Sequence, residues 1–354
     1  METPAFDAAH VPAIGRLESI QTLAPLDDYP KQIVALVRAR LHQGDDALAV
    51  SRAIGDANDA LTRRLLVLAE ESLGAPPCPY TWLALGSHGR REQVLSSDQD
   101  SAIAYDTTCS DDPVAGRYFA DLAGIMVAAL HRAGIPLCDG GYMATNWRRP
   151  LAEYAALFRG WVEAPQPVAL LQAEVFLDVR CCRGDLCIDT LERLLAVGGT
   201  RGPFRAQMAH AAVTFRPPIG LFGRLRPHDR VIDVKRGGTA AIVLLARLYA
   251  LVAGSSEHST VPRLRAAAAA GTLSESDCAD LIAAYGLLTD LRLRHQLDQV
   301  AGASEATGDV AAYDNLVRID RLSGPRRSDL RAALRVVREI QEVTAMRFAT
   351  HTVT

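Results

Sequence analysis

Two clusters of prolines divide this chain into three parts, and they restrict the possible folds more than any other feature. Pro76, Pro77 and Pro79 form the first cluster, and the pair Pro217-Pro218 forms the second. Proline lacks a backbone N–H and clashes with the preceding helical turn, so neither cluster suits a helix interior. We therefore expect an N-terminal helical region over 1–75, a mixed domain over 76–215 and a mainly helical domain over 216–354.

The middle part alternates short apolar runs with amphipathic segments. Strands are predicted over Tyr80–Leu85, Asp100–Tyr105 and Val175–Cys181, with Asp178 inside the last one, and a helix is predicted over 113–134. Elsewhere the apolar residues recur mostly at helical spacing, over 30–41, 54–74, 185–212, 261–270, 275–300 and 326–348, with a further helix from about 239. The pattern predicts an α+β protein, with a small mixed sheet between N-terminal helices and a C-terminal, mainly helical domain.

Composition places the chain among globular proteins. Of its 354 residues 49% are hydrophobic, and a formal net charge of −3 argues against a dedicated nucleic-acid binder. The seven cysteines form no CxxC pair, so neither a disulfide framework nor a zinc site is indicated. The N-terminus lacks the apolar stretch of a secretory signal, and no apolar run reaches a membrane span. We expect a cytoplasmic protein without membrane attachment.

A glycine turn directly follows the first predicted strand. Gly86-Ser87-x-Gly89 precedes Arg90-Arg91-Glu92, where a short helix is predicted to begin. Backbone N–H groups at such a helix start bind phosphate well, and glycines let the backbone approach a ligand closely. Arg90 is a candidate phosphate contact. The turn is neither a P-loop, which needs GK[ST], nor a dinucleotide fingerprint, which needs GxGxxG.

Three carboxylates accompany this turn. Asp98 and Asp100 stand two apart at the start of the next strand, so they point to one face, and oxygen ligands suit Mg²⁺. Asp178 lies in an apolar run, where a charge is expensive unless it is paired or bound to metal. If the strand of Asp178 neighbours that of Asp100, the three form a two-metal site for phosphoryl displacement. Each motif alone is common, but their combination favours nucleotidyl transfer over coincidence.

These residues resemble a known family. The runs Gly86-Ser87-x-Gly89-Arg90-x-Glu92-Gln93 and Ser97-Asp98-Gln99-Asp100 resemble the nucleotidyltransferase domain of protein-PII uridylyltransferase. They are closer still to a group of bacterial signal-transduction nucleotidyltransferases that are usually fused to CBS and cyclic-nucleotide-binding domains. The resemblance covers about residues 25–345. It continues in Gly140–Asn146, Phe176–Arg180, Gly220–Arg224, Asp233–Gly238 and Leu291–Gln296.

The resemblance implies a polymerase-beta type fold and Mg²⁺-dependent transfer of an NMP from an NTP to an acceptor hydroxyl. Asp98 and Asp100 would hold both metal ions, and Asp178 would bind the ion that activates the acceptor. Gly86 and Ser87 would hold the β- and γ-phosphates. The same resemblance adds Gly89, Arg90 and Gln93 to the nucleotide-binding set. We expect no CBS or cyclic-nucleotide domain before residue 25, which leaves the source of regulatory input open.

Of the 38 lysines and arginines only Lys31 and Lys235 are lysines. Lys235 and Arg236 start the run Lys235-Arg236-Gly237-Gly238, after a hairpin predicted from 221–226 and 231–234. They are candidates for a second anion site that reaches the triphosphate or an acidic acceptor. The alternative is a helix-capping turn with solvated charges. We expect Lys235 to face the three carboxylates.

Two functions remain open at this point. The first is a Mg²⁺-dependent nucleotidyltransferase that modifies an acceptor hydroxyl, with a regulatory protein as the expected acceptor and partner. The second is a nucleotide-binding regulatory module with little turnover, which signals through its C-terminal helices. A homodimer is plausible for either. The sequence names neither the base of the NTP nor the acceptor.

Overall fold

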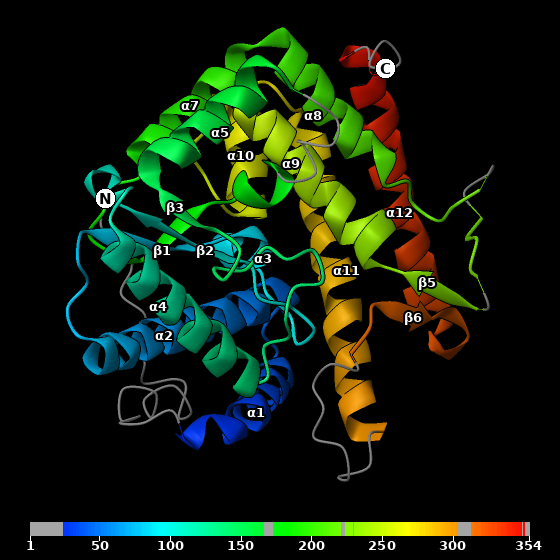
Figure 1. The fold of residues 1–354 in the computed structure, drawn as a ribbon. Coiled ribbons are helices and arrows are strands. Elements are labelled where there is room, and N and C mark those ends of the chain that lie inside the picture. The colour runs from blue at the N-terminus through cyan, green and yellow to red at the C-terminus, as the bar shows by residue number, and fades with distance from the viewer. Residues whose placement is uncertain are drawn as a thin grey trace. The chain divides into compact units, whose positions relative to one another are not determined.

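The computed structural model describes residues 24–165, 173–220, 224–228, 230–302, 313–348 and 350. These residues form two compact units, which are coloured along the chain in Figure 1. The first unit contains residues 24–154, 175–188 and 313, and the second contains the remaining described residues. The helices of the predicted N-terminal region belong to the first unit, and the predicted domain limits at 75 and 215 stay predictions.

The first unit is built on a four-stranded sheet in the order β3-β2-β1-β4. Strand β1 (Tyr80–Ala84) pairs antiparallel with β2 (Ser101–Tyr105) and with β4 (Arg180–Gly184), and β3 (Arg148–Pro150) runs parallel to β2. The end of β1 therefore lies beside the starts of both neighbours. The segments after β1, before β2 and before β4 meet at this one edge of the sheet.

Two long helices pack in the core of the first unit with one face of this sheet. They are α2 (Ala47–Leu73) and α4 (Pro113–Arg132), while α1 (Tyr29–His42), α3 (Gly86–Arg90) and the 3-10 turns η3 (Ala24–Asp28) and η4 (Thr107–Cys109) are shorter. Asp46 and Asp112 cap α2 and α4 by accepting the N–H of Ala49 and Val114, each at 2.8 Å. The helices predicted from apolar spacing in 30–74 and 113–134 are confirmed.

Helix α4 is long and apolar enough, by length and composition alone, to cross a membrane, and it is the one such helix in the described part of the chain. Half of that stretch is buried inside the protein. Phe119, Leu122 and Met126 on its inner face are fully buried and belong to the same core as Trp82 of β1. Helix α4 thus serves as a core helix of this unit.

The predicted strand over Val175–Cys181 is wrong. Residues 173–176 are helical, Asp178 lies in a turn closed by the Val179 N–H on the Phe176 carbonyl at 3.0 Å, and strand β4 begins only at Arg180. The apolar run is buried for another reason, because the ring of Phe176 packs at a tilt against that of Trp147, with ring centroids 4.6 Å apart. Strand β1 also separates β4 from β2, so the strand neighbouring that of Asp100 is not the one that follows Asp178.

The second unit is mainly helical. Its central helix α9 (Ala240–Val252) is buried from Ala241 to Ala250, as expected for a helix that is apolar on all sides. The surrounding elements are α5 (Leu151–Glu163, which enters this unit at Ala155), α7 (Asp189–Thr200), α8 (Gly202–Thr214), α10 (Thr260–Ala269), α11 (Glu275–Gly302), α12 (Gly324–Arg347) and the turn η8 (Ile319–Arg321). The predicted α+β organisation is confirmed.

A two-stranded sheet completes the second unit. Strand β5 (Val231–Asp233) pairs antiparallel with β6 (Leu316–Arg318), and a single turn of π-helix, η6 (Lys235–Thr239), connects β5 to α9. The predicted hairpin is therefore replaced by a pairing with a strand far along the chain. Part of that prediction, residues 221–223, lies outside the described residues.

Candidate active site

Helix α3 begins at Gly86, four residues earlier than predicted, and ends at Arg90; the next residue, Arg91, caps it with a left-handed φ of 54°. Its first helical hydrogen bond runs from the Gly89 N–H to the Leu85 carbonyl at 2.8 Å. The N–H groups of Gly86, Ser87 and His88 precede this bond and so have no partner within the helix. This places three backbone donors at the edge of the sheet where β1 ends.

Asp98, Asp100 and Cys138 form a cluster at the same edge. Each offers one ligand atom, and the three atoms lie within 4.8 Å of one another. Burial, together with the Asp100 carboxylate, raises the pKa of the Cys138 thiol to about 12, so the thiol is protonated at neutral pH. The donors fit a divalent cation held by the two carboxylates, because Mg²⁺ prefers oxygen and a neutral thiol is a weak ligand for it.

Two glycines of the turn are required by close contacts with the carboxylate segments. A Cβ on Gly86, whose φ is +51°, would collide with Oδ2 of Asp100. A Cβ on Gly89 would collide with the backbone oxygen of Asp178 and would lie 3.0 Å from that of Ala84. The sequence predicted that these glycines allow close approach to a ligand, and the structure shows close approach to Asp100 and to the turn of Asp178.

Gln99 holds the two aspartates in place from behind. Its side chain is buried, and its Nε2 donates to the Val127 carbonyl at 3.2 Å and to the Ile135 carbonyl at 3.0 Å, at the end of α4 and just beyond it. Its own N–H donates to the Pro136 carbonyl at 2.9 Å. Asp98 and Asp100 are both half-buried on either side of it. Strand β2 begins only at Ser101, so both aspartates precede the strand at whose start they were predicted, although their burial still alternates with that of Gln99.

Asp178 is fully buried and forms an ion pair with Arg90. Nε of Arg90 also donates to Oε2 of Glu92 at 2.8 Å. The carboxylate of Asp178 lies outside the cluster of Asp98, Asp100 and Cys138 found among the described residues. Arg90 therefore contacts two carboxylates, and the predicted roles of Asp178 in metal binding and of Arg90 in phosphate binding stay predictions.

Ser87 and Gln93 differ in their exposure. Ser87 is half-buried, and its backbone oxygen accepts the Glu92 N–H at 2.9 Å, which closes the turn. Gln93 is 1% exposed, its backbone oxygen accepts from Oγ of Ser51 at 2.9 Å, and its Oε1 has no partner among the described residues. Nucleotide contacts by Ser87 and Gln93 stay predictions.

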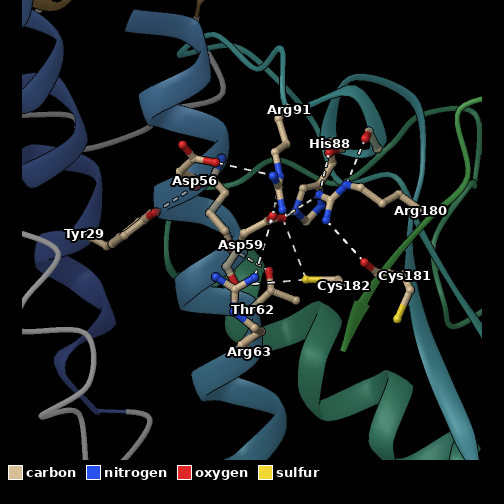
Figure 2. A network of polar contacts seen from close by, with 12 residues as sticks. Tyr29, Asp56, Asp59, Thr62, Arg63, His88, Arg91, Arg180, Cys181 and Cys182 are labelled. Atoms are coloured by element: carbon tan, nitrogen blue, oxygen red, sulfur yellow. Dashed lines mark hydrogen bonds and ion pairs between the residues drawn. The ribbon is translucent and has the colours of Figure 1, made fainter. Parts of the chain in front are cut away.

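A buried carboxylate that the sequence analysis did not single out lies behind the turn. Asp59, in the middle of α2, is 1% exposed (Figure 2). Its Oδ1 accepts from Arg180 at 2.7 Å and lies 2.9 Å from Nε2 of His88, and its Oδ2 accepts from Nε of Arg91 at 2.9 Å. His88 is itself buried against this carboxylate.

The charge of Asp59 is stabilised by these partners. Burial alone would raise the pKa of Asp59, but hydrogen bonds and charge from His88 and Arg180 outweigh it and hold the pKa well below its usual range. The ionised carboxylate only accepts, so Nε2 of His88 carries the proton. Asp59, His88 and Cys182 also meet the spacing of a metal site, but the two guanidinium groups already occupy the carboxylate and disfavour a cation there.

Lys235 and Arg236 belong to the second unit. Oδ1 of Asp233 accepts both of their backbone N–H groups at 2.9 Å, so these donors are already used. The guanidinium of Arg236 lies 5.7 Å from the ring centre of Phe215, and a Cβ on Gly237 would lie 2.8 Å from the Arg216 carbonyl oxygen. The backbone thus forms the capping turn considered as the alternative. Anion binding by the exposed side chains of Lys235 and Arg236 stays a prediction.

Comparison with known proteins gives two matches. A family model described as "Putative nucleotidyltransferase DUF294" matches residues 31–168, which contain the glycine turn, Asp98 and Asp100. A second, described as "Putative nucleotidyltransferase substrate binding domain", matches residues 202–348. Together they span more than half of the chain. No curated protein matches it.

Proposed function

Since this chain belongs to the DUF294 family of putative nucleotidyltransferases, we propose that it transfers an NMP from an NTP to an acceptor hydroxyl with the help of Mg²⁺. The two matched descriptions support nucleotidyl transfer and a separate substrate-binding region. Magnesium, the identity of the acceptor and turnover itself are parts of this proposal. So are the expected regulatory protein as acceptor, a homodimer and a cytoplasmic location.

The observation that carries the proposal is the contact between the glycine turn and a metal-type carboxylate pair. Gly86 packs directly against the carboxylate of Asp100, and Asp98 and Asp100 share one cluster. The backbone N–H groups that can bind phosphate therefore lie next to the carboxylates that can bind a cation, as a nucleoside triphosphate with its cation requires. A solvated surface pair of aspartates would show no such packing.

The proposed reaction follows from these positions. The N–H groups of Gly86, Ser87 and His88 bind the triphosphate, and Asp98 and Asp100 would hold the cation. When bound, the cation supplies charge neutralisation on the phosphates. The acceptor oxygen forms a bond to the α-phosphorus, the bond from this phosphorus to the bridging oxygen breaks, and pyrophosphate leaves. The acceptor proton passes to a carboxylate, for which Asp178 is the predicted group.

The test is a labelling screen with each NTP in turn, labelled on the α-phosphate, with Mg²⁺ and a cell lysate as the source of acceptor. Label should enter a product that mass spectrometry identifies. Asp98→Asn and Asp100→Asn should each reduce the rate by about a thousandfold, because each removes a ligand of the cation. Asp121→Asn, on the exposed side of α4, should change nothing and serves as the control. Full labelling by the Asp98→Asn/Asp100→Asn variant would contradict the proposal.

One observation favours the second function, nucleotide binding with little turnover. Arg90 forms an ion pair with Asp178, the group expected to assist the acceptor. A chain that only binds NTP should show heat of binding by calorimetry with Mg²⁺ but no release of pyrophosphate. Pyrophosphate release that requires Asp98 would decide for the enzyme.

A further inference from the structure

We propose that Asp59 is a positioning residue, which fixes the α3 turn against helix α2 so that its N–H groups face the nucleotide phosphates. The inference rests on the proposed function, since it takes the turn as the phosphate site. Asp59 acts through the groups that it holds, which come from three segments: α3, the residue after it, and the start of β4.

Asp59 collects three donors on a single buried carboxylate. His88 lies inside α3, Arg91 directly follows it, and Arg180 is the first residue of β4. Figure 2 shows all three side chains converging on the carboxylate from the same side of α2. Charge-assisted hydrogen bonds of this kind are stronger than neutral ones, and burial strengthens them further. Removing the carboxylate would take a shared acceptor from two half-buried guanidinium groups.

Arg180 carries the anchoring from Asp59 into the backbone of the turn. Its Nε donates to the Gly89 carbonyl at 3.0 Å, and its Nη2 donates to the His88 carbonyl at 3.1 Å. These carbonyls point toward the C-terminal end of α3, where a positive charge is favourable. The N–H groups at the other end must then point the opposite way, toward the segment of Asp100 that packs on Gly86.

Helix α2 is shaped for this contact over two turns. Ser51, Gly55 and Asp59 recur every four residues and therefore lie along one face of the helix. Oγ of Ser51 donates to the Gln93 carbonyl at 2.9 Å. A Cβ on Gly55 would lie 2.9 Å from Cα of Arg91, so only glycine lets the helix come this close. The turn and the residues after it are thus held at three successive points of α2.

A second ion pair on the same two elements provides a matched comparison. Arg183 of β4 donates to Oε2 of Glu70 on α2 at 2.9 Å, three helical turns beyond Asp59. This pair joins the same strand to the same helix and, within the described part of the chain, makes no hydrogen bond to the turn. Glu70→Gln and Arg183→Lys are therefore controls for Asp59→Asn and Arg180→Lys. The arginine variants keep the charge and lose the forked donor, so they test positioning even if Asp59→Asn folds poorly.

The experiment compares these four variants with the natural chain in two measurements. The first is amide hydrogen exchange without nucleotide, and the second is steady-state kinetics with the NTP identified by the screen. We expect Asp59→Asn and Arg180→Lys to speed exchange selectively at residues 86–93. They should also raise the KM for NTP by about tenfold while kcat changes by no more than about threefold. Glu70→Gln and Arg183→Lys should leave residues 86–93 and the KM unchanged.

Equal effects of the Asp59 and Glu70 pairs, or faster exchange spread evenly over the first unit, would overturn the inference, because both indicate loss of stability alone. An unchanged KM in Arg180→Lys would also overturn it. Failure of the proposed function looks different. In that case the natural chain neither binds nor transfers NTP, whereas exchange at residues 86–93 still responds to Asp59 and not to Glu70.

Discussion

Gly86 lies so close to Asp100 that a single added carbon atom would disturb the candidate site. We expect Gly86→Ala to abolish transfer, because the added Cβ would displace the Asp100 carboxylate and the φ of +51° is unfavourable for alanine. Gly116 in α4 has no atom within 4 Å of an added Cβ, so Gly116→Ala should keep activity and stabilise the chain by about 0.5–1 kcal/mol. Rates and urea unfolding of the two variants test this. Equal activity of both would contradict the close contact.

From the lowered pKa of Asp59 we predict how the free energy of unfolding depends on pH. Its pKa is lowered in the folded chain, so the unfolded chain takes up a proton first as pH falls below the ordinary value of 3.8. The stabilisation by Asp59 is therefore complete above that value and is lost in more acidic solution. The free energy of unfolding of Asp59→Asn should be about 3 kcal/mol lower than that of the natural chain, because the substitution breaks the ion pairs of a buried carboxylate. Urea unfolding should give a constant difference from pH 8 to 5, shrinking below pH 4.

The residues that the sequence did not reveal share one property: they act across long distances in the chain. Cys138 joins Asp98 and Asp100 from a segment beyond α4, with no motif around it. Asp59 lies within a helix predicted from apolar spacing, where a single polar residue carries no functional signal. Its signal was the four-residue spacing from Ser51 and Gly55, which has meaning only once the helix is placed against the turn.

At the scale of elements, local rules worked where local interactions decide. Helix α2 follows a capping aspartate and ends before Gly74, and α4 follows Asp112-Pro113, so both were predictable from capping residues and apolar spacing. The run Val175–Cys181 was not, because periodicity cannot tell a short buried strand from a buried turn. The pairing of β5 with β6 joins segments more than 80 residues apart, which no local pattern specifies.

The turn η6 allows a prediction at this scale. Asp233 accepts the N–H groups of Lys235 and Arg236, so Asp233→Ala should lower the free energy of unfolding by about 1 kcal/mol, as the loss of a helix cap does. Asp329 is exposed on α12, and Asp329→Ala should change stability by less than about 0.5 kcal/mol. Urea unfolding of both variants gives the comparison. A difference between them near zero would show that the cap is replaced by water.

At the scale of the molecule, substitutions at the two lysines are predicted to have different effects on the kinetics. Lys31 lies on α1 with an exposed Asp28 oxygen 3.8 Å away, and Lys235 lies on η6 of the second unit. If Lys235 reaches the nucleotide during the reaction, Lys235→Ala should raise the KM for NTP by about tenfold, the loss of one charged contact. Lys31→Ala should leave kinetics unchanged. Equal KM values would make Lys235 a solvated charge of a capping turn.

The predicted class of fold and the family hold for the molecule as a whole, since both depend on features spread along the chain. The glycine turn and the Asp-x-Asp segment lie within the match to the first family model, and the helices after 201 lie within the second. Proline clusters, apolar spacing and these motifs were enough to predict the class of fold and the family. The meeting of Asp178 with Arg90 was not, because it depends on how a buried turn packs before β4.

The pairing of β1 with β4 shifts register between Trp82 and Leu83, which leaves Cys182 as an extra residue on β4. In a regular strand, residues three apart point to opposite faces, yet Arg180 and Arg183 both reach α2. The length of this short strand is thus part of the site. Deletion of Cys182 would turn Arg180 away from Asp59 and release the turn without altering any residue of the proposed nucleotide site. Chains derived from this one can therefore vary in length far more freely in the surface loop at 106–112 than in these five residues.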